Sequence, residues 1–119
     1  MKPLLWVGSS LADIRAFPAS ARREAGYRLY LVQQGLGPPG WKPMPQIGPG
    51  VAAIRIRTNG QHRVFYLARL AEGVYVLHAF EKKTGKTARR DIALACARYR
   101  EVLRQRGDFR AERRRSDET

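Results

Sequence analysis

The stretch AAIRIRTNGQHRVFYLARLAEGVYVLHAFEKKTGKT, from Ala52 to Thr87, decides the fold of this chain. Its runs of β-branched and aromatic residues are separated by two turn signals, Asn59-Gly60 and Glu72-Gly73. The pattern predicts three short antiparallel strands, at about residues 51–58, 63–68 and 74–80.

The predicted strands carry an unusual excess of cations. Ile54 and Ile56 alternate with Arg55 and Arg57, which predicts one apolar and one cationic strand face. More cations follow in the same stretch, at Arg63, Lys82, Lys83 and Lys86. A face of one charge sign is typical of a surface that binds a polyanion such as RNA. The same residues also have explanations without a ligand. The arginines are then charges that keep edge strands from aggregating, and the lysines belong to an ordinary exposed loop.

The composition of the whole chain supports a polyanionic partner. Among 119 residues, 23 Lys and Arg against 10 Asp and Glu give a net charge of +13. Residues 1–50 contribute +4 and residues 51–119 contribute +9. A small protein tolerates such self-repulsion best when an anion relieves it, so we expect the partner-facing surface mainly in the second half.

The residues before the three strands predict a short strand, two helices and a loop. We expect a strand at 4–7, a helix from Ser9-Ser10 to Pro18, and a second helix at about 20–34. The second helix buries a stripe at positions Ala21, Ala25, Leu29 and Val32. In residues 35–50, ten of sixteen are Gly or Pro, so this segment is expected to be a long loop without strands. Its apolar residues are expected to dock it onto the domain: Trp41, Met44 and Ile47.

A last helix is expected from Thr87 to about Arg106, before Gly107. Its apolar positions fall at helical spacing: Ile92, Ala95, Cys96, Tyr99, Val102 and Leu103. We expect the helix to pack against the domain through Ile92, Cys96, Tyr99 and Leu103. Residues 108–119 have no apolar stripe, so they are expected to form a flexible basic tail after a single domain at 1–107.

The sequence does not support a metal site, a cofactor or export. The lone Cys96 excludes an internal disulfide, and His62 and His78 have no acidic or thiolate cluster at ligand spacing around them. We expect His62, beside a turn, to titrate near neutral pH. His78 shares the alternation of Val74, Val76 and Phe80 and is expected to be packed rather than catalytic. Without a signal peptide or an apolar segment of membrane-spanning length, the expected location is the cytoplasm, with no membrane partner.

The order of strand, two helices, Gly/Pro loop, three strands and helix resembles the RelE/ParE toxin superfamily, and most closely its phage-derived, HigB-like branch. The resemblance runs from about Leu4 to Arg106. It rests on Lys42-Pro43 with Gly48 and Gly50, Ile54-Arg55-Ile56-Arg57, Gly60 with Arg63-Val64-Phe65-Tyr66, and His78-Ala79-Phe80-Glu81-Lys82-Lys83 with Lys86-Thr87. The resemblance implies an α+β fold, with an N-terminal strand and helical hairpin on a mainly antiparallel sheet and a C-terminal helix.

The resemblance also implies an activity. Such proteins are toxins of type II toxin–antitoxin systems, most often mRNA interferases that cleave mRNA on the ribosome without a metal and thereby arrest translation. By position, Arg55, Arg63 and Lys83 are the implied catalytic residues of such an endoribonuclease. RNA binding is implied for Arg57, Lys82, Lys86, Arg89 and Arg90. The implied partners are mRNA, the ribosome and a cognate antitoxin of helix-turn-helix type with an acidic contacting segment.

Two departures from the family pattern leave a second hypothesis open. Ala53 stands where relatives have a lysine or a glutamate, and no tyrosine opens the last helix, so the general acid or base is unassigned. A non-catalytic protein of the same fold is therefore the alternative. It is either a ParE-like inhibitor of DNA gyrase or a remnant that binds only RNA or its antitoxin.

Overall fold

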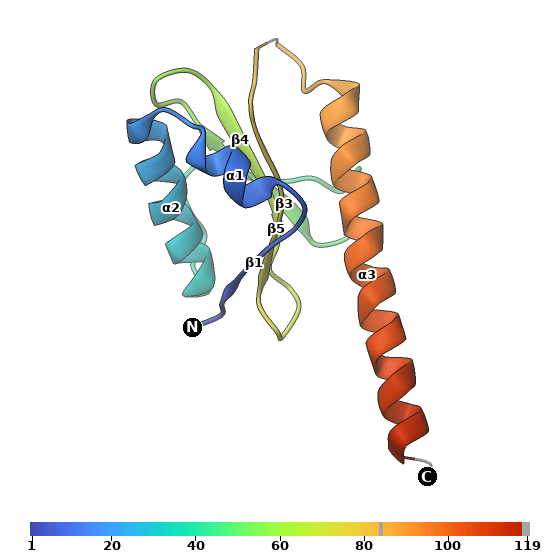
Figure 1. The fold of residues 1–119 in the computed structure, drawn as a ribbon. Helices are drawn as coiled ribbons and strands as arrows, with labels where there is room; N and C mark the ends of the chain where they lie inside the picture. The colour runs from blue at the N-terminus through green and yellow to red at the C-terminus, as the bar shows by residue number, and fades with distance from the viewer. Residues whose placement is uncertain (84, 118–119) are drawn as a thin grey trace.

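One sheet lies between two layers of helices (Figure 1). The computed structural model describes the backbone of residues 1–83 and 85–117, with side chains for 1–83 and 85–107. The elements follow the predicted order, with one extra strand: β1 (Leu4–Trp6), α1 (Ser10–Arg15), α2 (Ala19–Gln33), β2 (Trp41–Pro43), β3 (Val51–Ile56), β4 (His62–Leu67), β5 (Val74–Glu81) and α3 (Arg89–Asp117). The expected α+β fold is confirmed and is compatible with a RelE-like fold.

The sheet is mixed, with strand order β1-β5-β4-β3-β2. The central hairpins are antiparallel, as the short connections require, whereas β1 pairs in parallel with β5. Both central residues of the predicted turn between β3 and β4 have positive φ, 54° at Asn59 and 102° at Gly60. That backbone is the one that Asn-Gly favours in hairpins, so the sequence signal and the geometry agree.

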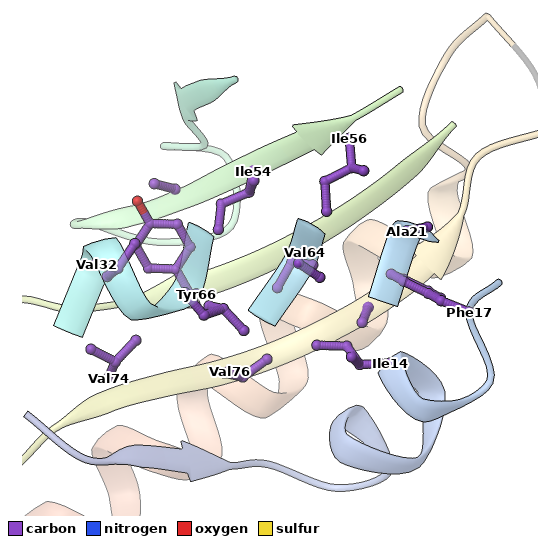
Figure 2. Close-up of a cluster of buried hydrophobic side chains, with 14 residues drawn as sticks. Ile14, Phe17, Ala21, Val32, Ile54, Ile56, Val64, Tyr66, Val74 and Val76 are labelled. Carbon is purple, nitrogen blue, oxygen red and sulfur yellow. The ribbon is translucent and has the colours of Figure 1, made fainter. Parts of the chain in front are cut away.

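The helical hairpin of α1 and α2 covers one face of the sheet (Figure 2). Ile54 and Ile56 are fully buried against it, as the alternation in β3 predicts. The predicted stripe of α2 is also confirmed, because each of its members is buried: Ala21, Ala25, Leu29 and Val32.

The other face of the sheet packs against α3 and the Gly/Pro loop. The expected contact through Leu103 is wrong, since this side chain is 40% exposed whereas its neighbour Val102 is 3% exposed. Ala95 and Val102 form the centre of the helix face, with Ile92, Cys96 and Tyr99 partly buried beside them. Both Val102 and Leu103 belong to the predicted apolar pattern. The rotation of the docked helix, which local sequence does not specify, buries Val102 and leaves Leu103 exposed.

Val102→Ala is therefore expected to lower the free energy of unfolding by about 2 kcal/mol, because it removes a buried side chain from this core. Leu103→Ala, one position further along α3, should lower it by less than about 1 kcal/mol because the site is largely exposed. Urea denaturation of both variants measures the difference. Equal losses would mean that α3 packs in a different rotation.

A β-bulge in β5 changes which side chains face α3. The pairing passes from Phe65 opposite His78 to Tyr66 opposite Val76, so Leu77 is the extra residue. His78 therefore leaves the alternation of Val74 and Val76 and lies with Phe65 and Phe80 on the α3 face. The predicted shared face of His78 with the valines is thus wrong, but the expected packing of His78 is confirmed by its 6% exposure.

The Gly/Pro segment is more ordered than predicted. It contains the short edge strand β2, which pairs with β3. Pro43 lies at the end of this strand, where a sheet edge tolerates a missing N–H donor. Met44 and Ile47 are buried as expected, while Trp41 remains 50% exposed. Two bonds from α3 hold the loop, from the Tyr99 hydroxyl to the Pro49 carbonyl at 3.2 Å and from Cys96 Sγ to the Gln46 carbonyl at 3.6 Å.

The last helix continues beyond its predicted end. It runs through Gly107 to Asp117 and projects away from the sheet (Figure 1), so the predicted stop at Arg106 is wrong. Glycine costs only about 1 kcal/mol inside a helix, and the surrounding residues are mostly good helix formers. The flexibility of residues 108–119 stays a prediction, and residues 118–119 lie outside the described part. In that part, no helix is both long and apolar enough to cross a membrane.

Candidate phosphate-binding site

Two arginines face each other across neighbouring strands at one end of the sheet. Arg55 on β3 lies directly opposite Arg63 on β4. Like charges in a cross-strand pair destabilise a sheet. In addition, Arg63 is only 7% exposed to solvent. One guanidinium nitrogen of Arg63 donates to the His62 carbonyl oxygen at 3.1 Å. The fold therefore holds a buried cation next to another cation, which is costly unless an anion joins them.

This pair lines a cavity of about 360 Å³. Its walls come from β2, β3 and β4, the loop after β5 and the first turns of α3. Five cations lie in the wall: Lys42, Arg55, Arg63, Lys82 and Lys86. The remaining lining residues are uncharged: Met44, Gln46, Ala53, Phe65, Gly85, Thr87 and Ile92.

The cations of the cavity affect one another electrostatically. Burial lowers the pKa of Arg63, and the neighbouring charges of Arg55 and Arg57 lower it further. Loss of solvent, followed by the charges of Arg63, Lys42 and Arg57, lowers the pKa of Lys82. Both shifts have the sign expected where cations crowd together without a counter-ion.

No carboxylate in the described part of the chain forms an ion pair with Lys42, Arg55, Arg63 or Lys82. The Lys82 ammonium donates instead to the Gly85 carbonyl oxygen at 2.9 Å. The cavity is therefore suited to an oxyanion with several acceptor atoms, and a phosphate group has that chemistry.

A family model for phage-derived Gp49-like proteins (DUF891) matches residues 12–100. The chain belongs to the Gp49-like family. This family is RelE-like and toxin-like, so the phage-derived and toxin-like part of the resemblance is confirmed. A comparison with curated proteins gives no match. All residues that line the cavity lie within the matched range of the Gp49-like chain.

Not all of the predicted site residues of the Gp49-like chain meet in the cavity. Arg55, Arg63, Lys82 and Lys86 line it, whereas Arg57 lines a neighbouring cavity. Lys83 is exposed and is not part of the lining. Lys82 and Lys83 both follow the end of β5, and only Lys82 lines the cavity. Arg89 and Arg90 lie exposed on the first turn of α3 and are not part of the lining either.

Lys42 is a site residue of the Gp49-like chain that sequence reasoning did not select. It lies on β2, directly opposite Ala53. Ala53 has a small side chain, and both residues line the cavity. The available signal was that Lys42 is the only charged residue among residues 35–50.

Neither histidine of the Gp49-like chain lines the cavity. The Nε2 atom of His78 lies 2.8 Å from Asp91 Oδ1, and its ring stacks on Phe80 behind the cavity wall. His62 begins β4 beside the turn, as predicted, but it is 1% exposed and packs on Phe17 with ring centroids 4.4 Å apart. Among the described residues, no group of three or more His, Cys, Asp or Glu is placed to hold a metal ion.

Burial of His62 also moves its titration below the neutral range that the sequence predicts. Burial lowers the pKa of His62 below 6.5, and the opposing effect of Glu81 is smaller. The folded state then resists protonation, whereas the unfolded state binds a proton as the pH falls through about 6.5. The free energy of unfolding should therefore fall as the pH decreases from about 7.5 to 5.5.

The variant His62→Leu should have a shallower pH dependence over that range, because it lacks this proton uptake on unfolding. Urea melts of the Gp49-like protein and the variant at several pH values measure the two curves. Curves that differ by a constant offset at every pH would exclude His62 as the source.

Proposed function

We propose that this Gp49-like protein is the toxin of a type II toxin–antitoxin pair and cleaves mRNA on the ribosome. One observation carries the proposal. It is the cavity in which Arg55, Arg63, Lys82 and Lys42 converge without a carboxylate partner among the described residues. Membership in a toxin-like family supports the same assignment.

The lining of the cavity limits the chemistry to what cations and the RNA itself supply. The 2′-oxygen of a ribose attacks the adjacent phosphorus, a new O–P bond forms, and the bond to the 5′-oxygen breaks. The leaving 5′-oxygen takes a proton from solvent, so the products are a 2′,3′-cyclic phosphate and a 5′-hydroxyl. Arg55 and Arg63 would hold the phosphate and offset the charge that develops on its oxygens in the transition state.

We propose Lys82, which lines the cavity, as the group for proton transfer. Lysines surrounded by other cations lose a proton more readily than isolated ones, and catalytic lysines use this property. The pKa of Lys82 is lowered by its surroundings. We assign Lys82 the removal of the 2′-hydroxyl proton and leave Lys83, outside the cavity, as a contact for the RNA backbone.

The proposed partners follow from the charge. A net charge of +13 has to be masked when the toxin is silent, so the antitoxin is expected to contact it through an acidic segment. We propose the helix-turn-helix type of antitoxin that accompanies such toxins.

A reconstituted translation reaction tests the proposed activity. Purified protein is added to ribosomes that translate a defined mRNA, and the RNA ends are analysed. We expect fragments with 5′-hydroxyl and 2′,3′-cyclic phosphate ends, formed only when the mRNA is being translated. Intact mRNA at a protein concentration that saturates the ribosomes would contradict the proposal.

A specific observation keeps a non-catalytic function as the second candidate. Within the described lining of the cavity, no side chain carries a carboxylate, an imidazole or a phenol, which are common acid–base groups of ribonucleases. A protein that only binds, as a ParE-like gyrase inhibitor or an RNA-binding remnant, needs none of them. A DNA supercoiling reaction with gyrase, run with the same preparation, separates the two. Inhibition of supercoiling together with intact mRNA would favour this candidate.

A further inference from the structure

A second cationic cavity lies next to the first. It has a volume of about 300 Å³ and is lined by Arg28, Pro39, Gly40, Arg55 and Arg57. Arg55 lines both cavities, so they are neighbours on the surface of the molecule. The proposed cleavage chemistry uses only the first cavity and leaves the second without a role.

Hydrogen bonds of Arg28 hold the wall of this second cavity together. Its side chain is 14% exposed and its Nε donates to Glu24 at 2.7 Å. One terminal nitrogen donates to two backbone carbonyl oxygens, of Pro39 at 3.1 Å and of Arg55 at 2.6 Å. These bonds connect α2, the Gly/Pro loop and β3, so the cavity is built by three elements and is not an accidental surface hollow.

Gly40 allows the loop to approach β3 closely enough to form the cavity. Its φ is +78°, and a Cβ atom there would overlap the Arg55 carbonyl oxygen. The Gly40 carbonyl oxygen accepts the backbone N–H of Arg55 at 3.0 Å and its Nε at 3.3 Å. The guanidinium group of Arg55 is thereby held by one edge, which leaves its two terminal nitrogens to face a ligand.

Arg57 supplies the second set of free donors. It is exposed and follows Arg55 by two residues, just past the end of β3. Within the described residues, no carboxylate forms an ion pair with Arg55 or Arg57. None of the described residues that line the cavity is acidic, and the carboxylate of Glu24, outside the lining, pairs with Arg28. The net charge around the cavity is therefore positive.

We propose that this second cavity binds the phosphate next to the one being cleaved, so that the protein holds two successive phosphates of a single RNA strand. The inference rests on the proposed function. Residues two apart on a strand are about 7 Å apart, which is comparable to the spacing of neighbouring phosphates in an extended RNA strand. Arginine forks bind phosphate oxygens in pairs, and Arg55 between the cavities would contact both groups.

Binding of short RNA analogues tests this inference. The probes are 2′-O-methyl UpU, with one phosphate, and 2′-O-methyl UpUpU, with two; neither can be cleaved through its 2′-oxygen. The protein is expected to bind the two-phosphate probe roughly tenfold more tightly. The dependence of log affinity on log salt should also be steeper by about 0.7, the value for one more phosphate contact in a single strand.

The variant Arg57→Gln should remove this advantage, because it weakens the two-phosphate probe by a larger factor than the one-phosphate probe. Arg22→Gln, an exposed position on α2, is the matched control and should keep the advantage. Melting temperatures close to that of the unmodified protein would show that both variants fold.

Two results would overturn the inference. One is equal affinity of the unmodified protein for the two probes. The other is an Arg57→Gln variant that weakens both probes by the same factor. Neither result depends on cleavage, so a protein that prefers two phosphates but leaves translated mRNA intact would refute the proposed function alone.

Discussion

Replacing Arg63 with methionine is expected to lower the rate of mRNA cleavage by roughly 10²–10³-fold. Arg63 is the most buried cation of the cavity and lies directly opposite Arg55. A preorganised donor aimed at a reacting phosphate contributes mainly in the transition state, so its loss should appear in the catalytic rate more than in binding. The readout is the rate of fragment formation in the translation reaction.

Methionine keeps most of the buried aliphatic part of the side chain, so the fold should tolerate the change. The lost bond to the His62 carbonyl costs about 1 kcal/mol, and relief of the repulsion from Arg55 and Arg57 offsets part of it. Arg22→Met, on the exposed surface of α2, is the matched control and should cleave at the normal rate. Full activity of folded Arg63→Met would remove this arginine from the site.

Lys82→Met is expected to lower cleavage on the order of 10²-fold, whereas Lys83→Met should lower it only a few-fold. The two lysines are adjacent in sequence, but Lys82 lines the cavity and Lys83 does not. The two variants have the same change in net charge, so general electrostatic attraction of RNA is matched between them. Rates over a pH series also separate the roles, because a proton acceptor at Lys82 gives a pH dependence that its removal flattens.

A larger loss in Lys83→Met than in Lys82→Met would restore the assignment made from the sequence resemblance. It would also mean that the loop after β5 changes its arrangement when RNA binds.

The parts of the fold that could be predicted from sequence depend on local patterns. The alternation of Ile54 with Arg55 specifies which face of β3 packs against the helical hairpin, and the spacing from Ala21 to Val32 specifies the buried face of α2. Each pattern is repeated over several residues, so a single exception does not change the prediction.

The features that were missed depend on contacts between distant segments. The bulge at Leu77 forms where β4 and β5 meet, and it moves His78 to the α3 face. Val102 replaces Leu103 in the core because the approach of α3 to the sheet selects one of two adjacent apolar residues. The short-range periodicity of the sequence specifies neither the register of a strand pair nor the rotation of a helix that docks on the sheet.

The cationic character of the candidate cavity could be predicted from the sequence, whereas the full set of residues that line it could not. Arg55 and Arg63 were selected from their strand positions, and the hairpin register brings them together. Lys42 was not selected because it reaches the cavity through β2, a strand that a Gly/Pro-rich sequence does not predict. Lys83 lies in the loop after β5, outside the cavity, and no periodic pattern specifies the arrangement of a loop.

The most direct test of the central claim, that the cationic cavity cleaves translated mRNA, is a map of mRNA 5′-ends in cells that express the protein. Cells that express Arg63→Met at the same level are the control. The account predicts new 5′-hydroxyl ends within translated regions, in phase with codons, and their absence in the Arg63→Met cells. Unchanged mRNA ends together with growth arrest and DNA damage signalling would contradict it.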